Sequence, residues 1–222
     1  MTLSGCLPPV AQPGKWLRLN ESTLSFRGSI DSGSDKEFLA LVDTRISLIQ
    51  VSTFGGDVES ALVIADYLHD HKIDLKVEEV CVSSCANYWF PAANHKIVPV
   101  GAYVGFHGDV TSSIPYWHNP SAEAIKFAQK TSANEQAFYQ RIGLNPKLFQ
   151  FSIDFIETND VGIWVISPTE AACAGMKNLE MWFPNDPKEF TLANWRPYPN
   201  VGISFGDKRT PPQDFCQTTQ KP

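Results

Sequence analysis

The stretch that decides the fold is residues 51–57, VSTFGGD, in which a run of strand-forming residues ends in two adjacent glycines. Residues 47–52 are apolar enough to predict a buried strand, and Asp57 is placed to cap a following helix. Apolar side chains at helical spacing indicate that helix, and these are Val58, Ala61, Leu62, Ala65 and Leu68. The sequence therefore predicts a strand, a sharp Gly-Gly turn and a helix in direct succession.

The same succession of strand and helix recurs along the chain. Residues 75–82 predict a strand, after which Ser83 and Ser84 open a helical stretch that runs to about Pro91. Further strands are predicted at residues 24–28, 96–98, 102–106 and 163–166, and further helices at 36–41, 120–141 and 167–175. This alternation predicts βαβ units, and hence an α/β fold with a mainly parallel sheet. Both strand-to-helix turns are expected at the carboxyl edge of that sheet, where reactive groups collect.

The 222-residue chain is long enough for one well-buried domain. Residues 1–20 contain three prolines and show little periodicity, which predicts a tether or an irregular arm. Residues 21–183 carry the alternating pattern of the domain. Residues 184–222 are rich in proline, asparagine and aromatic side chains, and we expect them to form a loop-rich extension that wraps the domain.

Charge and hydropathy exclude several classes of protein. The formal net charge is −6, and no cluster of lysine and arginine stands out. Nucleic acid and anionic membrane surfaces are therefore not expected as partners. No run of about 18 apolar residues is present, so no membrane-spanning helix is predicted.

The cysteines leave two interpretations open. Cys6 ends the stretch LSGC, which is similar to the bacterial lipobox, although the charged start and apolar stretch of a signal segment are missing. The match is either accidental, which leaves a cytoplasmic protein as the alternative, or it indicates a periplasmic protein with a lipid anchor at Cys6. In the second case Cys81, Cys85, Cys173 and Cys216 are compatible with disulfides, and otherwise they are reduced and buried.

Three features could carry chemistry, and each also has an ordinary structural explanation. The pair Gly55-Gly56 is a tight turn, or it exposes a backbone N–H that can bind an oxyanion. A serine at the start of a helix is an N-cap, or it holds its hydroxyl beside unpaired backbone N–H groups. His107 follows an apolar strand, and it is either a surface residue or a general base for a serine.

Taken together, these features resemble the Clp-protease/crotonase superfamily, and most closely its ClpP-like and signal-peptide-peptidase-A-like serine peptidases with their periplasmic relatives. The resemblance covers roughly residues 24–180 and rests on four blocks, which are VSTFGGD at 51–57, SCANYWFPAANHKIV at 84–98, GAYVGFH at 101–107 and VISPTEAACAGM at 165–176. It implies a spiral of ββα units. It also implies a homo-oligomer that acts on a peptide or protein substrate and needs neither cofactor nor metal.

The resemblance assigns roles residue by residue. Ser84 would be the nucleophile, with Ser83 as the alternative, and His107 would be the general base. The oxyanion hole would be formed by the backbone N–H groups of Cys85 and of Gly55 or Gly56. Asp160 is the candidate for the acid that orients the histidine, while Asp154 and Glu157 stay possible because the spacing is longer than usual. A disulfide between Cys81 and Cys85 would rigidify the serine turn, and two separate buried thiols are an equal alternative.

Three functions are compatible with these residues. The first is a serine hydrolase, in the first place a peptidase, that forms an acyl-enzyme. The second is a binding or scaffold protein on the same fold, because fold alone does not specify function. The third is a crotonase-type acyl-CoA enzyme, which shares a glycine-based oxyanion hole but does not need a Ser–His pair.

Overall fold

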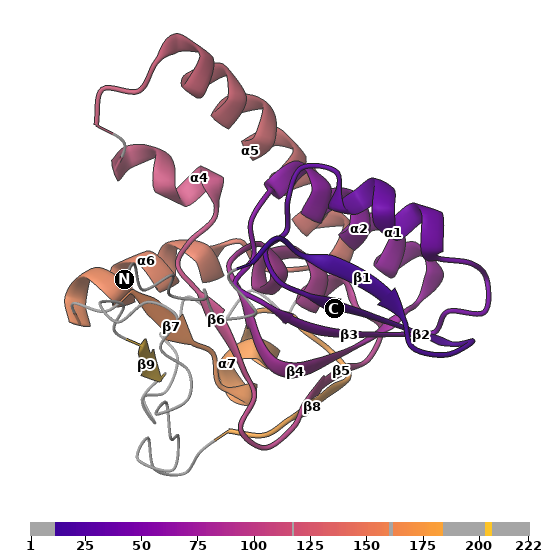
Figure 1. The fold of residues 1–222 in the computed structure, drawn as a ribbon. Coiled ribbons are helices and arrows are strands. Elements are labelled where there is room, and N and C mark those ends of the chain that lie inside the picture. Colours follow the sequence, from indigo (N-terminus) through magenta and orange to yellow (C-terminus); the bar gives the residue numbers. More distant parts are fainter. Residues whose placement is uncertain (1–11, 117, 160–161, 184–202, 206–222) are drawn as a thin grey trace, which may run out of the picture.

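The computed structural model describes residues 12–116, 118–159, 162–183 and 203–205, which form a single mixed sheet with helices packed against it (Figure 1). The strands are β1 (Lys15–Arg18), β2 (Thr23–Arg27), β3 (Leu48–Thr53), β4 (Asp74–Val82), β5 (Lys96–Val98), β6 (Tyr103–Phe106), β7 (Ile163–Val165), β8 (Leu179–Met181) and β9 (Ile203–Phe205). The helices are α1 (Ser34–Leu41), α2 (Val58–His71), the π-helix η2 (Cys85–Trp89), α3 (Phe90–Ala92), α4 (Val110–Ser113), the 3-10 helix η3 (Ile114–Tyr116), α5 (Ala122–Ile142), α6 (Lys147–Asn159) and α7 (Pro168–Cys173).

The sheet is mainly parallel, which confirms the predicted α/β class. Its strand order is β1-β2-β3-β4-β6-β7-β9, and β5 pairs with both β4 and β8. Only β1 with β2 and β6 with β7 run antiparallel among the described pairs. The central neighbours β2, β3, β4 and β6 are parallel, so their carboxyl ends lie at one edge.

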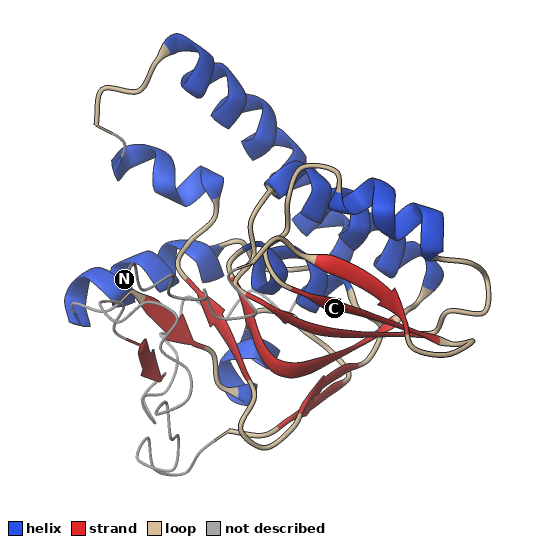
Figure 2. Cartoon of the chain, viewed as in Figure 1, coloured by secondary structure: helices blue, strands red, loops and turns tan. Residues whose placement is uncertain are grey.

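Apolar side chains fill both faces of this sheet. The larger core contains an aromatic cluster in which Trp16 packs against Phe26, Phe38 and Trp89 at centroid distances of 4.8 to 5.6 Å. A second, smaller core is formed by Val80, Val82, Tyr103, Ile163 and Val165. Helices α1 and α2 lie on the same side of the sheet, whereas α4 and the first turns of α5 extend away from the body (Figure 2).

The register between β3 and β4 brings the two candidate turns together. Val51 lies opposite Val77, but two residues later Thr53 lies opposite Cys81, so β4 contains extra residues at an irregularity. The shift places the end of β3 beside the end of β4. The Gly55-Gly56 turn therefore leaves the sheet next to Ser83 and Ser84.

Most predicted elements are confirmed, including the strands that precede both turns. Asp57 caps α2 as predicted, since its side chain accepts a hydrogen bond from the Ser60 N–H at 2.8 Å. The helix at 168–173 ends as predicted, because Gly175 adopts a positive φ of 92° and the Met176 N–H bonds back to Ala171 O. Helices α4, η3 and α6 and strands β8 and β9 were not predicted, and β9 lies within the stretch expected to be a loop-rich extension.

The prediction of an irregular arm over residues 1–20 is wrong for residues 15–18. Residues 15–18 form strand β1, which pairs with β2 at the edge of the sheet. The physical reason is Trp16, which is only 2% exposed and donates its indole N–H to Ser34 O at 3.2 Å. Cys6, Asp160, Cys216 and the extension at 184–202 and 206–222 lie outside the described residues.

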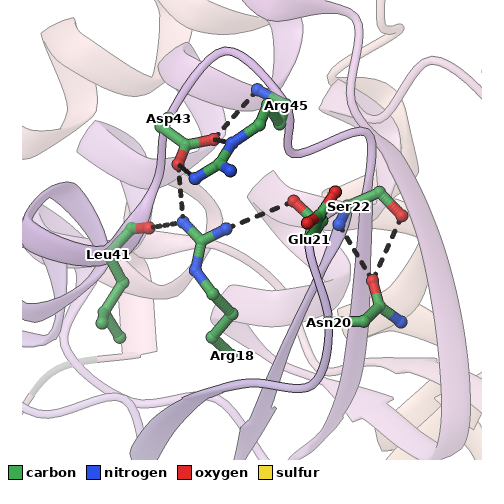
Figure 3. Close-up of polar contacts among 7 residues, drawn as sticks. All are labelled: Arg18, Asn20, Glu21, Ser22, Leu41, Asp43 and Arg45. Atoms are coloured by element: carbon green, nitrogen blue, oxygen red, sulfur yellow. Dashed lines mark hydrogen bonds and ion pairs between the residues drawn. The ribbon is translucent and has the colours of Figure 1, made fainter.

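Polar contacts also hold β1 in place. The Arg18 guanidinium lies between two loops, where it donates to Asp43 Oδ2 at 3.0 Å, to Glu21 O at 3.2 Å and to Leu41 O (Figure 3). Arg45 binds the same Asp43 carboxylate at 2.8 Å. These groups are exposed, so we ascribe the position of β1 mainly to the burial of Trp16.

The role of β1 can be tested with Trp16→Ala. Loss of a buried tryptophan should lower the free energy of unfolding by about 3 to 5 kcal/mol. The control is Leu17→Ala on the same strand, where the side chain is 51% exposed and its loss should change stability by less than about 0.5 kcal/mol. Urea unfolding measures both variants. Equal urea midpoints for Trp16→Ala and the wild type would contradict the claim that burial of Trp16 holds β1 on the sheet.

Candidate functional site

The glycine turn after β3 is pinned by a neighbouring segment of chain. The Ile30 N–H donates to Gly55 O at 2.9 Å, and the Asp57 N–H donates to Ile30 O at 2.7 Å. Gly55 and Gly56 have φ of 86° and 146°, and a Cβ on Gly56 would lie 2.1 Å from Ile30 O. Both positions therefore require glycine. Gly55 needs it for its positive φ and for close packing, and Gly56 needs it for space beside Ile30.

The serine corner after β4 is strained. Ser83 has a φ of 57°, a left-handed conformation that residues with a Cβ rarely adopt. The Ser83 N–H donates to Gly105 O at 3.1 Å, and Ser83 O accepts from the Asn87 N–H at 2.7 Å. Strain of this kind costs about 1 to 3 kcal/mol and collects at functional sites, so it marks Ser83 as a functional candidate.

A disulfide closes the same corner. Cys81 and Cys85 are bonded to each other, so the covalent link spans both serines. Both cysteines are fully buried. Of the two alternatives for this pair, the structure therefore contains the disulfide, and it restrains the backbone that holds Ser83. Cys173 is also disulfide-bonded.

The two serines occupy different environments. Ser84 is 3% exposed, and its hydroxyl donates to Gly56 O at 2.7 Å. Ser83 is half-buried, and its hydroxyl has no hydrogen-bond partner among the residues that the structure describes. Ser84 therefore fastens the serine corner to the glycine turn, whereas the Ser83 hydroxyl is available to a ligand.

Both turns at this corner contribute backbone N–H groups, of which some are engaged and some have no acceptor among the described residues. The Gly55 N–H is engaged, because it donates to Thr53 Oγ1 at 3.0 Å. The Gly56 N–H makes no hydrogen bond within the described part of the chain. The amide of Ser84 belongs to the first turn of a helix, where backbone N–H groups lack intrahelical acceptors. Gly55 leaves room at this amide, since a Cβ there would lie 2.7 Å from Ser84 N and 2.8 Å from Ser83 Cβ.

His107 stands at the end of the adjacent strand. Strands β4 and β6 are parallel neighbours, and Val82 pairs with Gly105. Ser83 directly follows Val82, and His107 lies two residues after Gly105, so both residues leave the sheet at the same edge. The side chain is accessible at the surface, yet the surrounding protein removes enough water from the ring to lower its pKa below the ordinary 6.5. The imidazole is therefore neutral near pH 7, which is the form that a general base requires.

No hydrogen bond joins His107 to either serine in the described ranges of the chain. Hydrogen bonds between catalytic groups are often long in proteins without substrate and shorten when substrate binds. His107 therefore stays a candidate for the general base. The turn that carries Ser83 and Ser84 is hydrogen-bonded to the Gly55-Gly56 turn, and His107 follows the adjacent strand β6 at the same edge of the sheet.

The third member of a triad is not found among the described candidates. Asp154 and Glu157 lie on exposed positions of α6, where Asp154 accepts from Gln150 Nε2 at 2.8 Å. Asp160 lies outside the described residues. The groups of three or more His, Cys, Asp and Glu side chains that a metal would need do not occur within residues 12–116, 118–159 and 162–183.

Sequence reasoning missed a set of buried polar residues beside His107. Asn87 donates from Nδ2 to Gly108 O at 2.9 Å, and Asp109 caps α4 through Ser112. Glu135 on α5 is fully buried. The spacing of Asp109 and Ser112 fits a capping box and could have been recognised, but the burial of Glu135 depends on contacts that are distant in the sequence.

No family model and no curated protein matches this chain. Among solved structures, it is similar to a mutant of ClpP1 from Listeria monocytogenes, with 17% identity, a TM-score of 0.43 and coverage of 77% of this chain and 95% of that one. It is also similar to a mutant of the membrane-bound stomatin-specific protease 1510-N, with 16% identity, a TM-score of 0.45 and coverage of 85% and 96%.

A third similar structure is an enoyl-CoA hydratase/isomerase from Xanthobacter autotrophicus Py2, with 10% identity, a TM-score of 0.31 and coverage of 67% and 80%. Likenesses this distant assign no role to any residue. The function is therefore argued from the residues themselves. None of the described helices is both long and apolar enough to cross a membrane.

The space at the serine corner can be tested with Gly55→Ala against Gly101→Ala. Both glycines have a φ of 86°, but a Cβ on Gly101 meets nothing within 4 Å. Each variant bears the strain of a positive φ, about 1 kcal/mol, and only Gly55→Ala also forces atoms apart at Ser83 and Ser84. Thermal unfolding should therefore show a clearly lower melting temperature for Gly55→Ala. Equal losses in the two variants would contradict the packing described here.

Proposed function

We propose that the protein is a serine hydrolase in which Ser83 is the nucleophile and His107 the general base. The observation that carries the proposal is the strained, half-buried Ser83, whose hydroxyl has no partner in the described structure, at a corner where the turns that carry the Gly56 and Ser84 amides meet. A serine that only caps a helix has no need of a left-handed backbone. Ser84, the nucleophile that the resemblance implied, instead donates its hydroxyl to Gly56 O.

The proposed reaction proceeds through an acyl-enzyme. Ser83 Oγ attacks the substrate carbonyl while His107 takes the hydroxyl proton, and the carbonyl oxygen becomes an oxyanion held by the Gly56 and Ser84 amides. His107 then gives the proton to the leaving group as its bond to the carbonyl carbon breaks. A water molecule, deprotonated by His107, attacks the acyl-enzyme, releases the acid product and restores Ser83.

A peptide or protein is the substrate class that we propose, with Asp160 as the acid that orients His107. The Cys81–Cys85 disulfide supports an oxidising compartment such as the periplasm, because such bonds persist there. A lipid anchor at Cys6 and assembly into a homo-oligomer stay predictions from the sequence. The scaffold function is the second candidate, because no carboxylate among the described residues makes a hydrogen bond or ion pair with His107.

The experiment is labelling with a fluorophosphonate, which reacts with activated serines. Ser83→Ala should abolish labelling, while Ser84→Ala should keep it and lower the free energy of unfolding by about 1 kcal/mol, the value of one lost hydrogen bond. Urea unfolding on the same samples separates chemistry from stability.

The other outcomes identify the other candidates. Labelling that survives Ser83→Ala and is lost in a folded Ser84→Ala would make Ser84 the nucleophile. A folded wild-type protein that does not label would favour the scaffold or the crotonase-type function, neither of which needs an activated serine.

A further inference from the structure

The carboxylate of Glu135 is buried at the junction of three segments. Glu135 lies on α5 and is 0% exposed. Its Oε1 accepts from the Tyr88 hydroxyl at 2.5 Å and from the Val110 N–H at 3.1 Å. Its Oε2 accepts from the Thr111 N–H at 3.2 Å and from Thr111 Oγ1 at 2.9 Å. One side chain thus joins the helix after the serines to the segment after His107.

A second contact joins the same two segments. Asn87, the neighbour of Tyr88 in η2, donates from Nδ2 to Gly108 O at 2.9 Å. Gly108 is the residue after His107. A Cβ on Gly108 would also lie 2.6 Å from the Ile153 side chain, so this short loop is enclosed from the side of α6 as well. Gly108, Val110 and Thr111 are therefore each fixed by at least one hydrogen bond from Asn87 or to Glu135.

The third restraint is the capping box of α4. Asp109 Oδ1 accepts from the Ser112 N–H at 2.7 Å and from Ser112 Oγ at 2.6 Å, and the Asp109 N–H donates to Ser112 Oγ at 2.9 Å. Asp109 is itself only 6% exposed. Burial, and then the charge of Asp109, raise the pKa of the Glu135 carboxyl.

An acid in this position is costly for stability alone. Within the described residues Glu135 makes no ion pair with lysine or arginine, so only neutral donors offset its desolvation. Buried carboxylates of this kind are costly, and a fully hydrogen-bonded one fixes a single geometry. The geometry that Glu135 fixes is that of the segment attached to His107.

We propose that Glu135 is a positioning residue for His107, which acts through Tyr88 and the amides of Val110 and Thr111 to hold the histidine loop at a set distance from Ser83. The inference rests on the proposed function, because a position matters only if His107 serves Ser83. It assigns a role to α5, whose first turns extend away from the body. Movement of that helix would then alter the position of the base.

The test compares Glu135→Gln and Tyr88→Phe with Thr131→Val. Thr131 lies one turn before Glu135 on α5, is 1% exposed, and its hydroxyl is buried with no hydrogen-bond partner in the described structure. Thr131→Val is therefore a matched control on the same helix. Tyr88→Phe removes only the hydroxyl and serves if Glu135→Gln does not fold.

Two quantities are measured for each variant. The first is hydrogen exchange of the amides of residues 107–113, which should become faster in Glu135→Gln and Tyr88→Phe and stay unchanged in Thr131→Val. The second is the labelling reaction with the fluorophosphonate, resolved into a binding constant and a maximal rate. Misplacement of the base should lower the maximal rate roughly 10- to 100-fold and leave the binding constant unchanged.

The outcomes separate this inference from the proposed function. Normal labelling rates in a folded Tyr88→Phe and Glu135→Gln would overturn the positioning role and leave the hydrolase intact. Unchanged exchange at 107–113 would overturn the tether itself, whether or not the protein labels. A wild type that does not label, with exchange changed as expected, would reduce Glu135 to a structural residue and count against the proposed function as well.

Discussion

The structure depends on the close approach of two turns, fixed by the hydrogen bond from Ser84 Oγ to Gly56 O. Parallel strands end at one edge, but they do not by themselves make their turns touch. The register shift in β4 and the absence of a side chain on Gly55 allow contact, and the buried hydroxyl of Ser84 then fastens it. A hydrogen bond of this kind contributes about 1 kcal/mol.

This contact explains how the strain at Ser83 is sustained. A left-handed serine would relax if its flanking residues could move. The Cys81–Cys85 disulfide, the Ser84 hydrogen bond and the Asn87 N–H that binds Ser83 O restrain the chain on both sides of it. The π-helical turn that follows, at Cys85–Trp89, is a further local departure from regular geometry, and such turns occur often at functional sites. These restraints thus stabilise Ser83 in a left-handed backbone conformation.

The sequence predicted the parts of this arrangement that are local. Apolar runs followed by Gly-Gly or Ser-Ser identified strands β3 and β4 and the helix α2. The spacing of apolar residues and the position of turn-forming residues are both properties of neighbouring residues, so the sequence shows them directly. Strand β1 was missed because it has four residues, directly follows Pro13 and Gly14, and depends on one buried tryptophan.

Which of the two serines is the nucleophile could not be predicted from neighbouring residues. Both stand at the same corner, and what separates them is the Gly56 carbonyl, which belongs to a turn 28 residues earlier in the chain. Glu135 was missed for the same reason. Its spacing on α5 resembles that of any surface glutamate, and its burial arises from residues 110 and 111 and from Tyr88.

The measurement that tests the central claim most directly is the mass of the peptide that carries the fluorophosphonate after the labelled wild-type protein is digested. Fragmentation of the peptide that contains both serines assigns the added mass to one of them. We predict that the adduct lies on Ser83, with Ser84 unmodified. An adduct on Ser84, or on a serine outside this corner, would contradict the assignment of the strained residue as the nucleophile.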